Sequence, residues 1–385
     1  MRKARLIFLI AVIAAAGPLS AAAADRQRPP AQVFNTAAEP GTLQAKLDRA
    51  LAAAPKAGPD PFWVGYAIDR LQGERSHIGS FWNGDRDRGP TVADVLAGRI
   101  APASSDATAV DVRKAATDAL GKIESQGKPE KKVLKDLGFF LKYKPGKPAV
   151  LADVRMSNLE LRFDFEGAPL YWLGKAAGDQ SMELVAALYG RNTGEKVRED
   201  LIAAAGCHGS SKLALPFLEK ALGGADPDDL RKDAAFWISQ LNDAEGLRLL
   251  AKTARADRSE EVREGAVFGI SQVELPAAVD EMISLARGAE MKDVRKQAVF
   301  WLSQMASEKS GKVLEQVALE DGAIEVQEHA IFALAELPDK QGLDALIKLA
   351  KTHPDVRLRK KAIFWLGETD DPRALEAIIA IVKGK

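Results

Sequence analysis

A repeat of 32 residues is the feature that most constrains the fold of this chain. The second half of the sequence contains five similar segments, each with a phenylalanine at the same place. Successive phenylalanines are always 32 positions apart, and they are Phe236, Phe268, Phe300, Phe332 and Phe364. A period kept over four intervals without an insertion predicts a stack of equivalent structural units.

Each of the five segments has the apolar spacing of one face of an α-helix. In the third segment the apolar positions fall at offsets 0, 4, 7, 8 and 11, and they are Val294, Ala298, Trp301, Leu302 and Met305. A second amphipathic stretch precedes each segment, as in residues 343–350, and turn residues such as His353-Pro354-Asp355 separate the two. Each unit is therefore expected to be a helical hairpin, and because one hairpin cannot bury its own apolar face, the hairpins should stack.

Weaker copies of the segment extend the pattern towards the N-terminus. Tyr171-Trp172-Leu173-Gly174 is similar to Phe364-Trp365-Leu366-Gly367, so we predict an array over residues 166–385 with about seven hairpins. The segment that starts at Leu358-Arg359 and ends at Leu366-Gly367 resembles the short HEAT-like repeat also found in phycobilin lyase subunits. The resemblance implies an all-α, right-handed α-solenoid with a binding or scaffolding role, and it names no substrate.

Three further ladders follow the repeat. Arginines begin four of the second helices, and an acid lies two residues before three of them, which resembles the inter-repeat hydrogen-bonded ladder of HEAT-like proteins: Arg231, Arg263, Arg295 and Arg359, with Asp229, Glu261 and Asp293. Large and small residues alternate at another position: Trp237, Gly269, Trp301, Ala333 and Trp365. Lysine and glutamate alternate five residues earlier, from Lys232 and Glu264 onward. We interpret all three ladders as packing between neighbouring units.

The phenylalanine row is the candidate binding surface. At 100° per residue, Phe236 lies about 220° from the core face centred near Leu230 and Leu241, so it cannot point at the partner helix of its own hairpin. One alternative is sideways packing against the next unit. The other is a partly exposed track on the concave face, formed by the five phenylalanines together with Gln240, Gln272 and Gln304.

The first 24 residues have the pattern of a secretory signal peptide. Basic residues at positions 2–5 precede an apolar run from Leu6 to Ala16, and Ala22-Ala23-Ala24 offers a small-residue cleavage site before Asp25. The run is shorter than the roughly 20 residues that cross a bilayer. We expect a periplasmic or secreted protein with no integral membrane span after cleavage, and an uncleaved signal acting as a tether stays as the alternative.

Residues 25–165 lack the repeat, and we predict a small, irregular α+β region there. Helices are expected over residues 41–54, 109–125 and 130–143, with a linker near 97–110. Aromatic and β-branched residues predict a strand over 62–68, and alternation from Leu159 to Phe165 predicts another that pairs with residues 148–156. This region would cap the first hairpin.

Composition and motifs favour binding over catalysis. With 54 basic and 54 acidic residues the net charge is zero, which argues against a nucleic-acid partner. The lone cysteine, Cys207, precludes an intramolecular disulfide and is expected to be a buried thiol beside an incidental His208. The four histidines lack metal-ligand spacing, so we expect no metal, no cofactor and no catalytic site. The favoured function is a non-enzymatic scaffold for a protein or peptide partner; the alternative is a lyase-type or cofactor-handling subunit acting on a bound small molecule.

Overall fold

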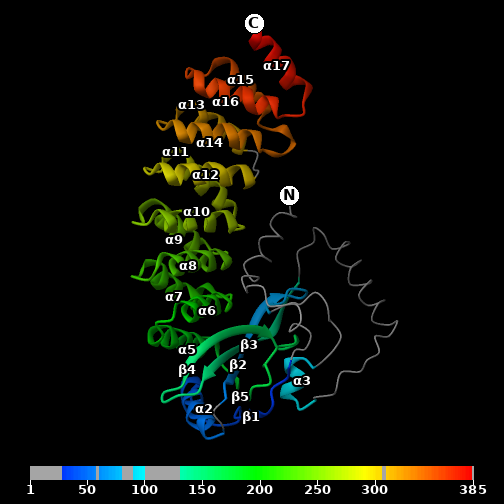
Figure 1. Ribbon diagram of the computed structural model, residues 1–385, viewed down its shortest axis with the longest axis vertical. Coiled ribbons are helices and arrows are strands. Elements are labelled where there is room, and N and C mark those ends of the chain that lie inside the picture. The colour runs from blue at the N-terminus through cyan, green and yellow to red at the C-terminus, as the bar shows by residue number, and fades with distance from the viewer. Residues whose placement is uncertain (1–27, 58–59, 80–89, 100–130, 306–308, 384–385) are drawn as a thin grey trace, which may run out of the picture. The chain divides into compact units, whose positions relative to one another are not determined.

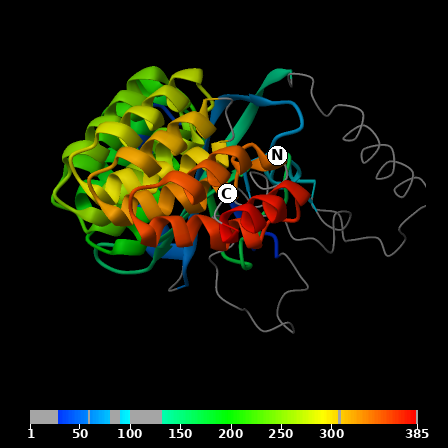
Figure 2. The same ribbon diagram turned by 90° about the horizontal axis from the view of Figure 1, so that it is seen from above.

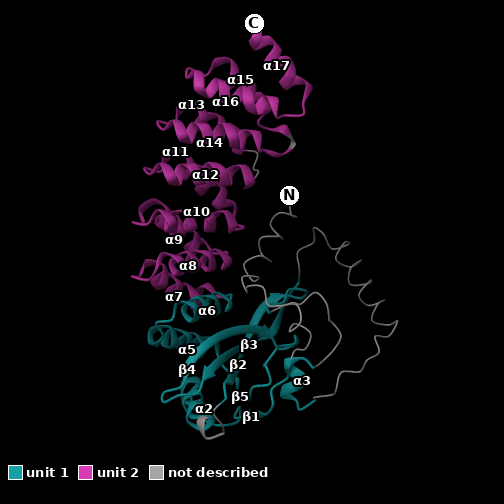
Figure 3. Cartoon of the chain, in the orientation of Figure 1, with its two compact units in different colours: residues 1–209 teal, residues 210–385 magenta. Residues whose placement is uncertain are grey.

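The computed structural model describes residues 28–57, 60–79, 90–99, 131–305 and 309–383, and the chain divides into two compact units. Unit 1 comprises residues 1–209 and unit 2 residues 210–385 (Figure 3). The predicted signal peptide, the predicted helix over 109–125 and residues 100–110 of the predicted linker lie outside the described residues.

Unit 1 is built on a five-stranded mixed sheet with the order β1-β5-β2-β3-β4. The strands are β1 (Val33–Asn35), β2 (Phe62–Gly73), β3 (Lys132–Lys144), β4 (Val150–Asn158) and β5 (Leu170–Lys175). Parallel pairing joins β5 to β1 and β2, and antiparallel pairing joins β3 to β2 and β4. The expected α+β region is therefore a regular sheet.

Four helices of unit 1 flank this sheet (Figure 1): α2 (Leu43–Ala57), α3 (Val92–Leu96), α5 (Gly178–Arg191) and α6 (Glu195–Gly206). Neighbouring residues of a strand face opposite sides, so Phe140 joins Trp63 and Val92 of α3 in one buried cluster. The adjacent Phe139 stacks on Tyr66 and lies against His208, which follows α6. Both faces of the central strands are consequently buried.

Several predictions for this region were wrong. Within the segment predicted as a helix over 130–143, the described residues from Lys132 onward form β3, because they pair with β2 from Lys132 to Tyr143 and bury side chains on both faces. Residues 159–165 are irregular, and the predicted partner strand over 148–156 corresponds to β4 (Val150–Asn158), which pairs with β3 instead. The alternation at 159–165 has a different cause, since Phe163 and Phe165 both pack around Trp63.

The segment at Tyr171–Gly174 is also not a repeat helix. It lies in β5, between β1 and β2, so the sheet extends beyond residue 165 and the first helix of the array starts at Gly178. Four consecutive buried residues explain the misleading likeness, since such a run fits a central strand as well as a helix.

Unit 2 is the helical repeat region that the 32-residue period predicts. Its helices are α7 (Ser211–Gly223), α8 (Asp228–Gln240), α9 (Ala244–Ala256), α10 (Glu260–Gln272), α11 (Pro276–Gly288), α12 (Lys292–Met305), α13 (Ser310–Glu320), α14 (Ile324–Ala335), α15 (Leu343–Thr352), α16 (Val356–Gly367) and α17 (Pro372–Val382). A short 3₁₀ turn, η1 (Pro338–Lys340), precedes α15. The hairpins follow one another in chain order in Figure 1 and overlap when seen from above in Figure 2.

Even-numbered helices of unit 2 are the second helices of the hairpins, and odd-numbered helices are the first helices. The last first helix, α17, has no second helix after it among the described residues. Each second helix packs against the next one, from α8 to α16. With α5 and α6 of unit 1, the described residues contain six helix pairs and α17, in agreement with the expected number of about seven hairpins.

Candidate functional site

The phenylalanine row runs along consecutive second helices, from α8 to α16. Phe236, Phe268, Phe300 and Phe332 are each partly buried, whereas Phe364 on α16 is 55% exposed. The helical-wheel argument explains this position, because a side chain about 220° from the core face can reach only its lateral neighbours or solvent. The row is therefore a surface feature as well as a packing feature.

Tryptophans of alternate units join the phenylalanines into aromatic clusters. The rings of Phe236 and Phe268 stack with centroids 6.4 Å apart. Trp301 contacts Phe268 of the preceding unit at 5.2 Å and Phe300 of its own helix at 5.0 Å. Trp365 repeats this arrangement with Phe332 and Phe364, at 5.0 and 5.1 Å. Sideways packing between units is thus present, and part of each ring still reaches the surface.

Buried serines, each followed by a glutamine at the surface, extend the row by one helical turn. Ser239, Ser271 and Ser303 are buried and donate hydrogen bonds to the backbone oxygens of Phe236, Phe268 and Phe300, at 2.6–2.7 Å. The side-chain amides of Gln240, Gln272 and Gln304 donate to these serines, at 2.9–3.3 Å. Within the described residues the glutamine carbonyl oxygens accept no hydrogen bond, so they can accept one from a partner.

A pocket of about 290 Å³ opens in the row between α8, α10 and α12. Its apolar walls are Phe268 and Trp301, and Lys232, Glu261, Glu264, Gly265 and Gln297 complete the lining. Sequence reasoning identified Phe268 but missed the pocket. The signal was present at Gly265, where the other units carry Asp233, Gln297, His329 and Lys361.

The predicted charge ladder has different partners from those expected. Lys232 lies 2.7 Å from Asp229 and 3.5 Å from Glu261, and the hydrogen bond to Asp229 raises the pKa of Lys232. Glu264 instead accepts a hydrogen bond from Gln297 of the next unit, at 2.9 Å. The predicted attraction between Lys232 and Glu264 of neighbouring units was therefore wrong, since each side chain has other partners.

The arginine ladder exists, with a partly different set of acids. Arg263 binds Asp293, at 2.9 Å, as the repeat predicts. Arg231 binds Asp228 and Asp257, however, and Arg295 binds Asp321. The expected partners Asp229 and Glu261 lie near Lys232 instead, as described above. Asp257 and Asp321 each follow the last residue of the first helix of the next hairpin. They were missed because the predicted acids were those two residues before an arginine. Among the described residues, Arg359 donates to the backbone oxygens of His353 and Pro354 and to no carboxylate.

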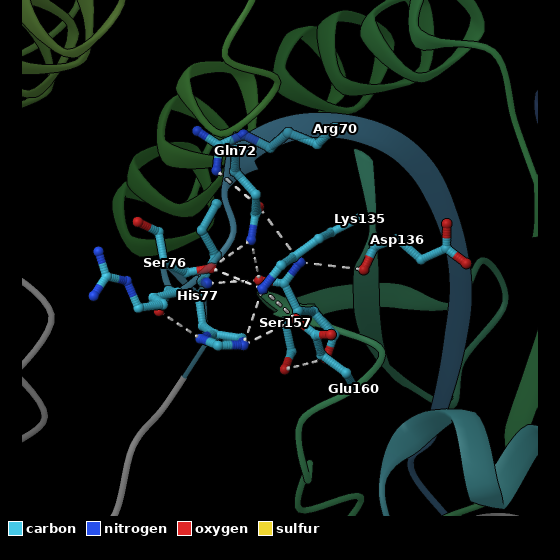
Figure 4. Close-up of polar contacts among 11 residues, drawn as sticks. Arg70, Gln72, Ser76, His77, Lys135, Asp136, Ser157 and Glu160 are labelled. Carbon is cyan, nitrogen blue, oxygen red and sulfur yellow. Dashed lines mark hydrogen bonds and ion pairs between the residues drawn. The ribbon is translucent and has the colours of Figure 1, made fainter. Parts of the chain in front are cut away.

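Unit 1 holds a polar cluster that sequence reasoning did not identify (Figure 4). Lys135 Nζ lies 2.7 Å from Glu160 Oε1 and donates to the Ser76 backbone oxygen at 3.2 Å, and His77 Nε2 is 2.9 Å from the same carboxylate oxygen. Nearby, Asn158 accepts hydrogen bonds from Gln72 and from the Ile78 backbone. These contacts tie residues 72–78 to β3 and β4. In the part of the chain that the structure describes, no group of three or more His, Cys, Asp or Glu could hold a metal ion.

A second polar group in unit 1 is buried. Tyr66 Oη lies 2.9 Å from Ser181 Oγ, and His208 Nε2 lies 2.8 Å from the same oxygen. His208 Nδ1 faces the Ala204 carbonyl oxygen at 2.9 Å, which assigns the proton to Nδ1 and makes Nε2 the acceptor for Ser181. Burial lowers the pKa of His208 to about 4 and raises the pKa of the neighbouring Cys207 thiol to about 11. The buried thiol is confirmed, whereas His208 is not incidental, because it links α6 to α5.

This group has the atoms of a base-activated serine without the access that such chemistry requires. Ser181, Tyr66 and His208 are all buried, so a substrate carbonyl cannot reach Ser181 Oγ in this structure. Its role here is to satisfy polar atoms between the sheet and α5. Among the described helices, none is long and apolar enough to cross a membrane.

Comparison with known proteins agrees with the repeat architecture. Residues 311–385 match the family model described as HEAT repeats, and no curated protein matches the chain. One similar solved structure is the complex of CpcE and CpcF of phycocyanin lyase from Nostoc sp. PCC7120, with 21% identity, a TM-score of 0.31, and coverage of 51% of this chain and 79% of that chain. Another is human deoxyhypusine hydroxylase, with 14% identity, a TM-score of 0.30, and coverage of 52% and 77%. The C-terminal part of the chain thus contains HEAT repeats.

Proposed function

We propose that this protein is a non-catalytic scaffold of the cell envelope that binds a protein or peptide along its phenylalanine row. The observation that carries the proposal is a line of partly exposed aromatic rings on five consecutive second helices. HEAT repeats are typical of protein-binding scaffolds, and their presence supports protein partners. A contiguous exposed apolar feature with polar neighbours is the usual property of an interaction surface.

The spacing of the row favours an extended partner segment. Packed helices lie about 8–10 Å apart, and an extended or polyproline-like chain rises about 3.1–3.4 Å per residue. A segment that crosses the second helices would therefore bring about every third side chain to a phenylalanine. Backbone N–H groups of the segment would meet the carbonyl oxygens of Gln240, Gln272 and Gln304, which lie one turn from the rings.

The non-catalytic part of the proposal rests on the chemistry of the row. Its repeated side chains are phenylalanine, serine and glutamine, and none of these titrates near neutral pH; the charged residues Lys232, Glu261 and Glu264 line the pocket described above. The serine hydroxyls already donate hydrogen bonds to backbone oxygens. The cell-envelope part rests on the sequence of residues 1–24. Amino-terminal sequencing of the mature protein tests that part separately, since cleavage after Ala24 leaves Asp25 as the first residue.

The test of partner binding is affinity capture from the native envelope fraction with the full-length protein, followed by mass spectrometry. The variant Phe268→Ser/Phe300→Ser removes two apolar anchors and is expected to lose the captured partner. Leu375→Ser is the matched control, because Leu375 is 61% exposed but lies on α17, which is not one of the second helices that carry the phenylalanine row. Capture is compared at a temperature at which circular dichroism shows each variant folded.

A second variant keeps the test decisive if the double variant unfolds. Phe364 is 55% exposed, so Phe364→Ser should fold and should still weaken capture. Folded variants that retain the same partner at the wild-type level would contradict the proposal. Loss of the partner in Leu375→Ser to the same extent would also contradict it, because any exposed apolar side chain would then suffice.

A further inference from the structure

Gly265 lines the pocket between α8, α10 and α12, and its lack of a side chain lets α8 approach α10 closely at this point. A Cβ atom at this position would lie 2.9 Å from Lys232 Cγ, closer than real Cβ contacts allow. The corresponding residue of every other unit in the five-segment repeat is larger. The lining also includes Phe268, so this recess lies in the phenylalanine row and is part of the proposed binding surface.

Aromatic rings form one side of this recess. The centroids of Phe268 and Trp301 are 5.2 Å apart and their planes are inclined by 47°, so the two rings form a corner. Aromatic faces attract cations, and guanidinium groups stack on them more readily than ammonium groups do. The corner is thus suited to a flat cationic group.

Two carboxylates also line this recess. Glu261 and Glu264 carry two negative charges against the single positive charge of Lys232, which leaves a net charge of −1 on the lining. The Lys232 ammonium is already engaged by Asp229, at 2.7 Å, and lies 3.5 Å from Glu261, while Glu264 accepts one hydrogen bond from Gln297 at 2.9 Å. An anionic guest would therefore meet two carboxylates and a lysine that is already paired, whereas a cationic guest would meet aromatic faces and carboxylate oxygens.

We propose that the Gly265 pocket binds an arginine side chain of the partner, with the guanidinium against Phe268 and Trp301 and its N–H groups donating to Glu264 and Glu261. The inference rests on the proposed function, since the pocket lies within the same row. Arginine is preferred over lysine because its planar group matches both the rings and a carboxylate, and because it is more weakly hydrated. The partner segment should then carry an arginine about three residues from an apolar residue.

The probe is N-acetyl-arginine amide, titrated into full-length protein labelled with 5-fluorotryptophan. Each of the six tryptophans carries one ¹⁹F label. The signal that disappears in Trp301→Phe is the one that belongs to the pocket. A saturable shift of the Trp301 signal with a dissociation constant in the millimolar range is the expected result. N-acetyl-citrulline amide, which has nearly the same shape without the charge, is expected to bind at least about tenfold more weakly, as a contact of about 1.4 kcal/mol requires.

Three variants locate the effect. Gly265→Ala would press against Lys232 and displace this pocket wall, so it should abolish the shift while circular dichroism shows the variant folded. Glu264→Gln keeps a hydrogen-bonding side chain but removes a charge, so it should weaken binding several-fold. Glu274→Gln removes an exposed charge outside the pocket lining and should change nothing. Equal binding of the arginine and citrulline probes, or an unchanged shift in Gly265→Ala, would overturn the inference.

The two proposals can fail independently. If Phe268→Ser/Phe300→Ser loses the captured partner while the arginine probe never shifts Trp301, the scaffold proposal stands and the arginine pocket is wrong. If the probe binds as expected but capture is insensitive to the phenylalanine variants, the row is not the partner surface and the pocket is a separate site for a cationic group.

Discussion

Phe268 on α10 packs against Trp301 on α12, with ring centroids 5.2 Å apart across the boundary between two repeat units. Trp301 also contacts Phe300 of its own helix, so one indole ring joins two phenylalanines of the row. The same pattern recurs at Trp365, two units later. Stability of the array and the composition of the candidate binding surface therefore depend on the same side chains.

Truncating Trp301 should destabilise unit 2 far more than truncating Lys296, which lies five residues before it on α12. Trp301→Ala removes two ring contacts and leaves a void beside Phe268, which should cost about 3 kcal/mol, the low end for aromatic truncations because the ring is partly exposed. Lys296→Ala should stay within about 1 kcal/mol. Urea titrations followed by circular dichroism measure both changes, and equal losses would refute the role of the tryptophans in packing.

Arg231 is the member of the arginine ladder whose removal should be most damaging. Its side chain is 3% exposed, it binds Asp257 of the next unit, and it donates to the Leu222 backbone oxygen at 2.8 Å. Arg231→Met would leave a mostly buried carboxylate without its cation, at a cost of about 3–5 kcal/mol. Arg248→Met is the control, because Arg248 is 73% exposed and its pair with Glu245 should contribute less than about 1 kcal/mol.

A double-mutant cycle identifies the cause of the Arg231 effect. If the unpaired carboxylate is responsible, Asp257→Asn should recover part of the stability lost in Arg231→Met. Additive losses would show instead that the arginine acts mainly through Leu222 and through the packing of its stem.

The sequence predicted the repeat region well because its signal is redundant. Five copies of one segment specify the helix, its buried face and its neighbour together, so the boundaries of α8, α10, α12, α14 and α16 follow from the spacing of Phe236 and its equivalents. The sheet had no such redundancy. Lys132–Lys144 is a strand because of its long pairing with β2, a contact between segments about 70 residues apart that local patterns do not contain.

Prediction of the candidate site was limited in the same way. The orientation of the phenylalanines followed from helical geometry, whereas the pocket depends on what surrounds Gly265, namely Lys232 of the preceding unit and Gln297 of the next. The hydrogen bonds among Tyr66, Ser181 and His208 join three elements of unit 1. No local sequence pattern connects these residues, so only the three-dimensional structure reveals the group.

Unit 2 should fold without unit 1. Repeats are stabilised mainly by their neighbours, so a fragment of residues 210–385 should be helical by circular dichroism and soluble. The longer fragment 166–385 should behave worse, because it carries β5 without β1 and β2, and Leu170 to Leu173 are all buried in the full chain. Size-exclusion chromatography should show self-association of the longer fragment only. A non-helical 210–385 fragment would mean that unit 1 is required for the fold of the array.

Asp200 on α6 should reduce the stability of unit 1 at neutral pH. Burial raises its pKa from 3.8 to about 6, although Lys196 opposes the shift from 2.8 Å away. The folded state then holds the proton more tightly than the unfolded state, so the contribution of Asp200 to stability falls as the pH rises from about 4 to about 6. Asp200→Asn should therefore raise the free energy of unfolding at pH 7, by on the order of 2 kcal/mol. A variant that is less stable than wild type at pH 7 would show that the pair with Lys196 outweighs the cost of burial.

His208 should act with the opposite sign over nearly the same range. Its folded pKa of about 4 lies below the ordinary 6.5, so the unfolded state takes up the proton first as the pH falls, and stability is lost between about pH 6.5 and pH 4. In the wild type this loss is masked in part, because Asp200 stabilises the fold as the pH falls through the same window.

Asp200→Asn should expose a steep rise in stability from pH 4 to pH 6.5. His208→Gln, which keeps a donor and an acceptor, should instead show stability that falls with rising pH. Urea midpoints of unit 1 at pH 4.5, 5.5 and 7 distinguish the two variants, and parallel curves would mean that neither group titrates as its burial predicts.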